Sequence, residues 1–128
     1  MPPSGLGFLL KALREERKLS LRELAQLADV DHAYVHRLET GEREAPSDEM
    51  LGKLVRGLKA QKREADMLRF LAQYGQTTPG VVRFALEDPT VSFEEFTTLA
   101  GAVFRGTTDY ASILKIIRRA QKEAEGGK

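Results

Sequence analysis

The chain has 128 residues, enough for one ordinary domain or for two small ones that share a core. Its 20 Lys and Arg residues nearly balance 19 Asp and Glu residues, and the net charge of +1 excludes a polybasic tail that binds nucleic acid by charge alone. The absence of cysteine excludes disulfides, thiolate catalysis and iron–sulfur clusters, and two histidines leave little material for a catalytic triad or a three-histidine metal site.

The first forty residues predict three helices. Leucines at positions 6, 9, 10 and 13 follow the spacing of one helix face. A short second helix ends near Ala28, and it begins after Ser20, which forms an S-x-x-E capping box with Glu23. Asp31 caps a third helix from His32 to about Thr40, and the next residue is a glycine, which suits a left-handed helix stop.

The rest of the chain predicts five more helices. A fourth opens at Pro46-Ser47, and a fifth spans Ala60 to Tyr74. The strongest break is GQTTPG at residues 75–80, and a second capping box joins Ser92 to Glu95. The last three predicted helices span Val81 to Leu86, Phe93 to about Phe104, and, after Gly106, Asp109 to about Glu125. Alternating strand patterns are nearly missing, so we predict an all-α fold of about eight helices.

The second and third helices have the lengths of a helix-turn-helix: a short capped helix, a three-residue turn and a second short helix. Ala25 is small where the two helices approach, Val30 fills the turn, and three apolar residues anchor the helices on the core: Leu24, Val35 and Leu38. The stretch LRELAQLADVDHAYVHRLETG resembles the helix-turn-helix of phage repressors and Cro proteins, the XRE family. With its flanks, the resemblance covers about residues 6–59.

The resemblance implies binding to double-stranded DNA, with the helix from His32 to Thr40 in the major groove. The positions that read bases match His32, Ala33, His36 and Arg37. Arg37 is the strongest candidate, because a guanidinium can bond to both O6 and N7 of guanine. The positions that hold phosphates match Ser20, Arg22, Asp31, Tyr34 and Arg43. A structural ion pair of the family matches Arg14 and Glu39.

Two positions depart from the family pattern. Asp29 stands where the turn usually has glycine, so we expect a left-handed backbone there, which aspartate tolerates better than most residues. Leu21 stands where the family often has a DNA-contacting glutamine, and we expect it to pack or to face a partner. The resemblance therefore implies one DNA contact fewer than is usual.

Simpler interpretations compete with these roles. Arg37 could be only a solvated side chain, and Tyr34 could serve packing alone. His32 and His36 have the spacing of a helical metal pair, but Ala33 replaces the acidic residue of an H-E-x-x-H motif and a third nitrogen ligand is missing. We therefore expect no metal and no cofactor. The sequence also shows no catalytic constellation, which predicts that the protein is not an enzyme.

We expect two modules within this fold. The N-terminal module has five helices and contains the helix-turn-helix, with its DNA-binding domain at residues 5–60. The second is a small helical module at residues 61–125. The last helix carries an apolar stripe that we assign to a homodimer or partner surface, formed by Tyr110, Ile113, Leu114 and Ile117. Basic residues near its end, Arg118, Arg119 and Lys122, are expected to complement the helix dipole.

These features predict a regulator, most simply a repressor that binds a palindromic operator as a homodimer. The rival interpretation is an antitoxin or adaptor, which binds a toxin or other protein partner through its C-terminal helices and regulates its own synthesis through DNA. A membrane helix needs roughly 20 apolar residues, and the chain has no such run and no secretory signal. We therefore expect a cytoplasmic protein without a membrane partner.

Overall fold

The structure is a computed structural model that describes residues 4–43, 45–102 and 109–126. Within these ranges it contains eight α-helices and no strand, which confirms the predicted all-α fold. The helices are α1 (Gly5–Glu16), α2 (Leu21–Ala28), α3 (His32–Thr40), α4 (Asp48–Leu58), α5 (Lys62–Gln73), α6 (Pro79–Glu87), α7 (Phe93–Gly101) and α8 (Tyr110–Gly126). None of these helices is long and apolar enough to cross a membrane.

The capping residues expected from the sequence start their helices. Ser20 accepts a hydrogen bond from the Glu23 N–H, and the Glu23 carboxylate accepts one from the Ser20 N–H, both at 3.0 Å. Ser92 and Glu95 form the same reciprocal box at the start of α7. Gly41 follows α3 with a φ of 85°, the left-handed stop that was predicted there.

Three helix boundaries differ from the prediction. α6 begins at Pro79 rather than at Val81, because proline suits the first position of a helix. α7 ends at Gly101 rather than near Phe104, because Ala102 has left the helical conformation with a ψ of 70°. Glycine weakens a helix at that point. Phe104 and Gly106 lie outside the described residues. α5 begins at Lys62 rather than at Ala60, since Lys59 adopts a left-handed conformation with a φ of 52° after α4.

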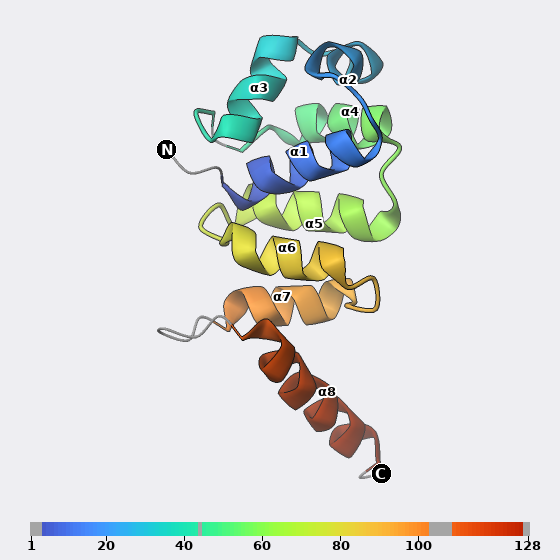
Figure 1. Ribbon diagram of the computed structural model, residues 1–128, viewed down its shortest axis with the longest axis vertical. Coiled ribbons are helices and arrows are strands. Elements are labelled where there is room, and N and C mark those ends of the chain that lie inside the picture. The colour runs from blue at the N-terminus through green and yellow to red at the C-terminus, as the bar shows by residue number, and fades with distance from the viewer. Residues whose placement is uncertain (1–3, 44, 103–108, 127–128) are drawn as a thin grey trace.

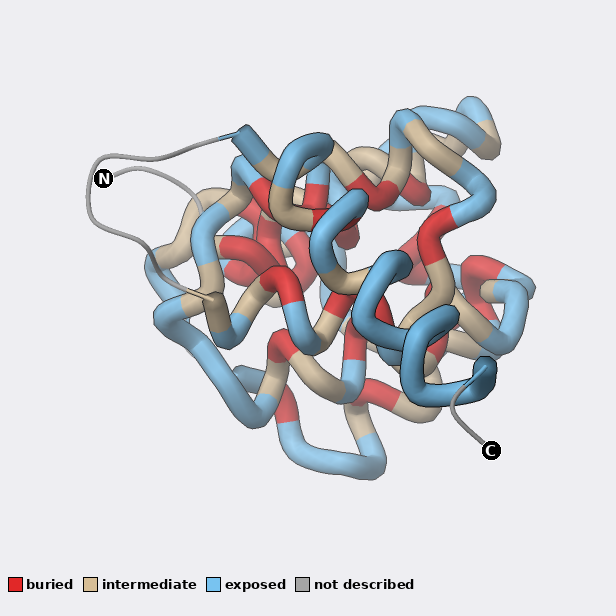
Figure 2. The backbone as a smooth tube through the Cα atoms, turned by 90° about the horizontal axis from the view of Figure 1, so that it is seen from below, coloured by how far each residue is buried: buried red, intermediate tan, exposed pale blue. Residues whose placement is uncertain are grey.

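The helices stack along the long axis of the molecule, with α2 and α3 at one end and α8 at the other (Figure 1). α1 lies between them and packs against α3, α5 and α6. The buried side chains form one continuous cluster that runs from Leu6 in α1 to Leu114 in α8, and buried segments accordingly gather inside the traced chain (Figure 2). The hydrophobic core is therefore shared across residue 60, and the functional division at that residue remains a prediction.

The apolar stripe of α8 packs against the chain's own core. Leu114 is only 4% exposed, and the other three stripe residues are partly buried against the same cluster. The Tyr110 ring lies 5.7 Å from the Phe84 ring, measured between centroids. The neighbouring side of α8 presents Ile116, which is 68% exposed. The residues assigned from sequence to a dimer or partner surface thus serve to dock α8.

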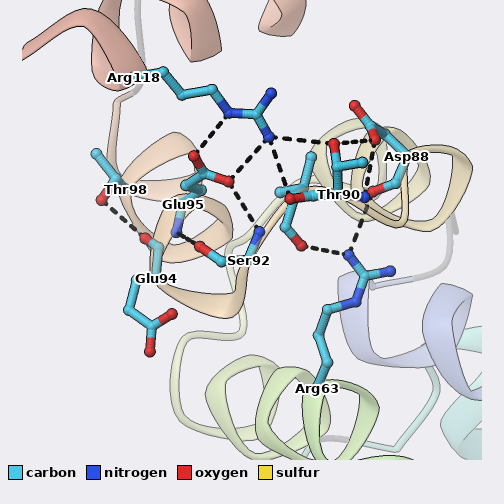
Figure 3. Close-up of polar contacts among 9 residues, drawn as sticks. Arg63, Asp88, Thr90, Ser92, Glu94, Glu95, Thr98 and Arg118 are labelled. Atoms are coloured by element: carbon cyan, nitrogen blue, oxygen red, sulfur yellow. Dashed lines mark hydrogen bonds and ion pairs between the residues drawn. The ribbon is translucent and has the colours of Figure 1, made fainter. Parts of the chain in front are cut away.

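Arg118 provides a polar anchor for the same helix. Its Nε donates to Glu95 Oε2 at 2.8 Å, and its Nη2 donates to the Thr90 carbonyl at 3.2 Å (Figure 3). The hydrogen bond from Arg118 lowers the pKa of Glu95. The stabilisation from this ionised carboxylate is therefore present above its unfolded pKa and is lost as the pH falls through its folded one. Arg118 was expected only to complement the helix dipole, but it also joins α8 to Glu95 and Thr90.

Replacing Leu114 by alanine tests whether α8 is part of the core. We expect Leu114→Ala to lower the free energy of unfolding by about 2–5 kcal/mol, because it opens a cavity at a buried site. Ile116→Ala, on the exposed side of the same helix, should change it by less than about 0.5 kcal/mol. Urea unfolding followed by circular dichroism measures both. Equal effects of the two substitutions would mean that α8 does not dock through this stripe.

Candidate nucleic-acid interface

The turn between α2 and α3 has the geometry that the sequence predicts. Asp29 is left-handed, with a φ of 57° and a ψ of 50°, and the next N–H, that of Val30, donates to the Ala25 carbonyl at 2.9 Å. Four residues of the motif are buried, and Val30 packs against them: Leu24, Ala25, Val35 and Leu38. The angle between the two helices is therefore fixed by a closed turn and a packed interface.

A bidentate ion pair holds α3 on α1. Arg14 donates from Nε to Glu39 Oε2 at 2.7 Å and from Nη2 to Glu39 Oε1 at 2.9 Å. Glu39 is only 6% exposed, and its hydrogen bond raises the pKa of Arg14, which stays charged. Arg14 also donates from Nη1 to the Leu19 carbonyl at 2.8 Å. The geometry matches the structural ion pair that the resemblance implies for these residues.

The backbones of α1 and α3 also touch. A Cβ atom placed on Gly7 would lie 2.5 Å from the Leu38 carbonyl oxygen, closer than real Cβ atoms approach. Only glycine therefore fits at this crossing. The ion pair and the close approach of the two backbones together fix the position of α3 against α1.

The outward face of α3 carries the four base-reading candidates. His32, His36 and Arg37 are exposed, and Ala33 is half-buried. Residues 32, 33, 36 and 37 share one helix face, and the buried positions of α3 lie on the other. No ion pair occupies Arg37 in the part of the chain that the structure describes. His32 Nδ1 lies 3.6 Å from Asp31 Oδ1.

The phosphate candidates lie around this face. Ser20 and Arg22 are exposed at the start of α2. Arg43 lies in the loop after α3, with its guanidinium carbon 5.5 Å from the centroid of the half-buried Tyr34 ring. Asp31 caps α3 by accepting a hydrogen bond from the Ala33 N–H at 3.1 Å. The structure thus gives Asp31 a capping role, and its carboxylate has the same sign of charge as a phosphate.

The charge at this end of the molecule is mixed. Arg22, Arg37 and Arg43 are accompanied by exposed acidic residues: Glu23, Asp29, Asp31 and Glu42. Hydrogen bonds from Ser20 lower the pKa of Glu23, which therefore remains ionised at neutral pH. Attraction between net charges is consequently small, and any affinity for DNA must come from individually placed side chains.

Sequence reasoning missed how α4 supports the motif. A Cβ atom on Gly57 would lie 2.9 Å from the Ala28 backbone nitrogen, so α4 crosses α2 at two small residues. Lys53 in α4 donates from Nζ to the carbonyl of the left-handed Asp29 at 3.4 Å. The small size of both Ala28 and Gly57 is the feature of the sequence that could have indicated this crossing. Leu21 packs partly buried against the core, which agrees with one of the two roles expected for it.

Comparison with known proteins decides what this arrangement is. The family model described as a helix-turn-helix domain matches residues 6–68, which take in almost all of α1, α2 to α4 and the first half of α5. Residues 6–68 are a helix-turn-helix domain. The chain is also similar to the HTH-type transcriptional repressor RghR of Bacillus subtilis (strain 168), with 43% identity over 53 residues. That match covers 41% of this chain and 39% of the relative's length.

The ion pair of the helix-turn-helix domain offers a stability test. We expect Glu39→Gln to lower the free energy of unfolding by about 1.5–3 kcal/mol, because it removes the charge that pairs with the half-buried Arg14 guanidinium. Glu42→Gln removes the same charge from an exposed position and should be nearly neutral. Thermal and urea unfolding of the two variants make the comparison. A tolerated Glu39→Gln would mean that packing alone holds α3 in place.

Proposed function

We propose that this chain is a sequence-specific DNA-binding transcriptional regulator that represses by occupying a promoter. The observation that carries the proposal is the outward face of α3, where exposed His32, His36 and Arg37 project from a helix that the Arg14–Glu39 pair fixes in place. A helix held in this way can enter the major groove with its N-terminal half. The similarity of residues 6–68 to a helix-turn-helix domain supports this function.

Specific side chains would carry the recognition. Arg37 is proposed to bond to guanine, His32 and His36 to purine or pyrimidine edges, and Ala33 to a thymine methyl group. Ser20, Arg22 and Arg43 are proposed to contact phosphates on either side, with Tyr34 beside Arg43. A regulator of this size reads few base pairs with one helix. We therefore propose that it binds a palindromic operator as a homodimer, which doubles the sequence that is read.

A second candidate function is an antitoxin or adaptor that binds a protein partner. The observation in its favour is the exposed side of α8, which carries the exposed Ile116. α8 lies at the end of the molecule opposite to α3 (Figure 1). A protein bound there would leave the face of α3 free for DNA. The two functions differ in what happens when Ile116 is replaced by aspartate: only the adaptor function requires a loss of partner capture.

Arg37 is the residue with which to test base reading. We expect Arg37→Ala to weaken binding to a duplex selected from a random pool by about 1–3 kcal/mol and to relax the preference at one position of each half-site. Melting should barely change, since Arg37 is exposed. Fluorescence anisotropy with the selected duplex and with single-base variants measures the effect. Arg119→Ala, on α8 at the opposite end, is the control for loss of one positive charge.

Two results would contradict this assignment of Arg37. Equal weakening across all base variants would make Arg37 a phosphate contact. Equal weakening by Arg119→Ala would mean that only overall charge matters. A failure of the unaltered chain to enrich any duplex from the pool would overturn the proposed function itself.

The homodimer makes a separate prediction about mass and symmetry. Light scattering after size-exclusion chromatography should give a complex of two chains on one selected duplex, and the selected sequences should have two-fold symmetry. Because the stripe on α8 packs within its own chain, Ile113→Asp should act mainly by destabilising the fold. One chain on an asymmetric site would contradict the dimer while leaving DNA binding intact.

A further inference from the structure

Arg43 is tied by its backbone to the residue that is proposed to read a base. The Arg43 N–H donates to the Arg37 carbonyl at 3.1 Å, and the Thr40 hydroxyl donates to the same oxygen at 3.2 Å. The intervening Gly41 makes this return possible, because its φ of 85° suits glycine. The loop after α3 therefore holds a fixed position relative to Arg37.

The side chain of Arg43 is held by a ring rather than by an acid. Its guanidinium carbon lies 5.5 Å from the centroid of the Tyr34 ring. Tyr34 itself is half-buried and packs against the hydrophobic core, so its ring is a fixed platform. Among the described residues no carboxylate pairs with Arg43. A guanidinium that lies on a ring keeps its N–H edge free for an anion.

We propose that Tyr34 is a positioning residue, whose ring rather than hydroxyl holds the Arg43 guanidinium against a DNA phosphate. This rests on the proposed function and deepens it, since Tyr34 now acts through Arg43 and not by touching DNA itself. The Arg43 N–H bond to the Arg37 carbonyl then sets the distance between the bound phosphate and the base read by Arg37. Tyr34, Arg43 and Arg37 thus form one preorganised unit, defined here as the arginine corner.

Positive and negative side chains are mixed at this end of the molecule, so net charge attracts DNA only weakly. The arginine corner supplies a phosphate contact that does not depend on net charge. A flexible surface arginine loses side-chain freedom when it binds a phosphate, whereas a guanidinium already held on a ring loses less. Phosphate contacts set the register of the protein on DNA, and base contacts supply the sequence preference. An arginine that is already held in position therefore contributes more to DNA affinity here than an additional mobile arginine would.

The test measures affinity for the selected duplex over a series of salt concentrations. Arg43→Gln should make the plot of log affinity against log salt shallower by about one unit, the contribution of one phosphate contact. Tyr34→Leu keeps an apolar side chain but removes the ring face. It should weaken binding by about two- to fivefold and lower the salt slope. Tyr34→Phe, which keeps the ring and lacks only the hydroxyl, should bind like the unaltered chain.

The double variant Tyr34→Leu, Arg43→Gln separates a linked pair from two independent contacts. If Tyr34 acts through Arg43, the double variant should bind no more weakly than Arg43→Gln alone. Additive losses would overturn the proposal. Arg119→Gln serves as the matched charge control on α8 and should leave the salt slope unchanged.

Tyr34→Phe keeps the proposal falsifiable even if the leucine variant does not fold. A loss of affinity and slope in Tyr34→Phe would show that the hydroxyl contacts the phosphate and would overturn the ring's role. An unchanged salt slope in a folded Tyr34→Leu would also overturn it. These failures are distinct from failure of the proposed function, in which the unaltered chain itself binds no selected duplex.

Discussion

The bidentate pair of Arg14 with Glu39 is the interaction on which the outward face of this molecule depends. It joins α1 to the last turns of α3, at a place where Gly7 lets the two backbones meet. A buried carboxylate is costly unless its charge is matched, so this pair permits few other positions of α3. α1 in turn packs against α5 and α6. The orientation of the outward face of α3 is therefore set by the centre of the molecule.

Hydrogen bonds from other arginine side chains to backbone carbonyls join the remaining helices and loops. Arg17 donates to the Leu58 carbonyl at the end of α4 at 2.6 Å, and Arg63 donates to the Val91 carbonyl at 2.6 Å. Arg118 donates to the Thr90 carbonyl (Figure 3). The Leu58 carbonyl is one of the last of α4, which lack partners within the helix, and the Val91 and Thr90 carbonyls lie in the loop between α6 and α7. A guanidinium can satisfy carbonyls of both kinds. Arg17, Arg63 and Arg118, like Arg14, thus connect helices and loops inside the fold, whereas no ion pair holds Arg37 or Arg43 among the described residues.

Local features could be predicted from the sequence because they depend on a few neighbouring residues. The capping boxes of Ser20 and Ser92 and the left-handed Asp29 are of this kind, since hydrogen bonds and backbone sterics determine them locally. Periodicity also identified the stripe of α8, but a stripe does not reveal what covers it. The structure covers it with the chain's own core, of which Leu114 is a part. α7 ends at Gly101, where a glycine weakens the helix.

The candidate site was predictable to a similar degree. The resemblance located α3 and the partners Arg14 and Glu39, because these positions keep a fixed spacing along the chain. It could not give the contacts of Tyr34 with Arg43, which depend on the path of the loop after Gly41. It also assigned Asp31 to phosphate, whereas the local sequence predicted that Asp31 caps α3, and its carboxylate does so. Spacing identifies which residues are available, and three-dimensional contacts decide what each one does.

An NMR titration is the direct test of whether the face of α3 binds DNA. The ¹⁵N-labelled chain is titrated with its selected duplex, and amide shifts are mapped along the sequence. We predict that the changes concentrate at the start of α2, along residues 32–37 and in the loop from Gly41 to Arg43. Amides of α7 and of the exposed half of α8 should move little. Changes centred on α6 to α8, with residues 32–37 unaffected, would show that DNA does not bind to the face of α3.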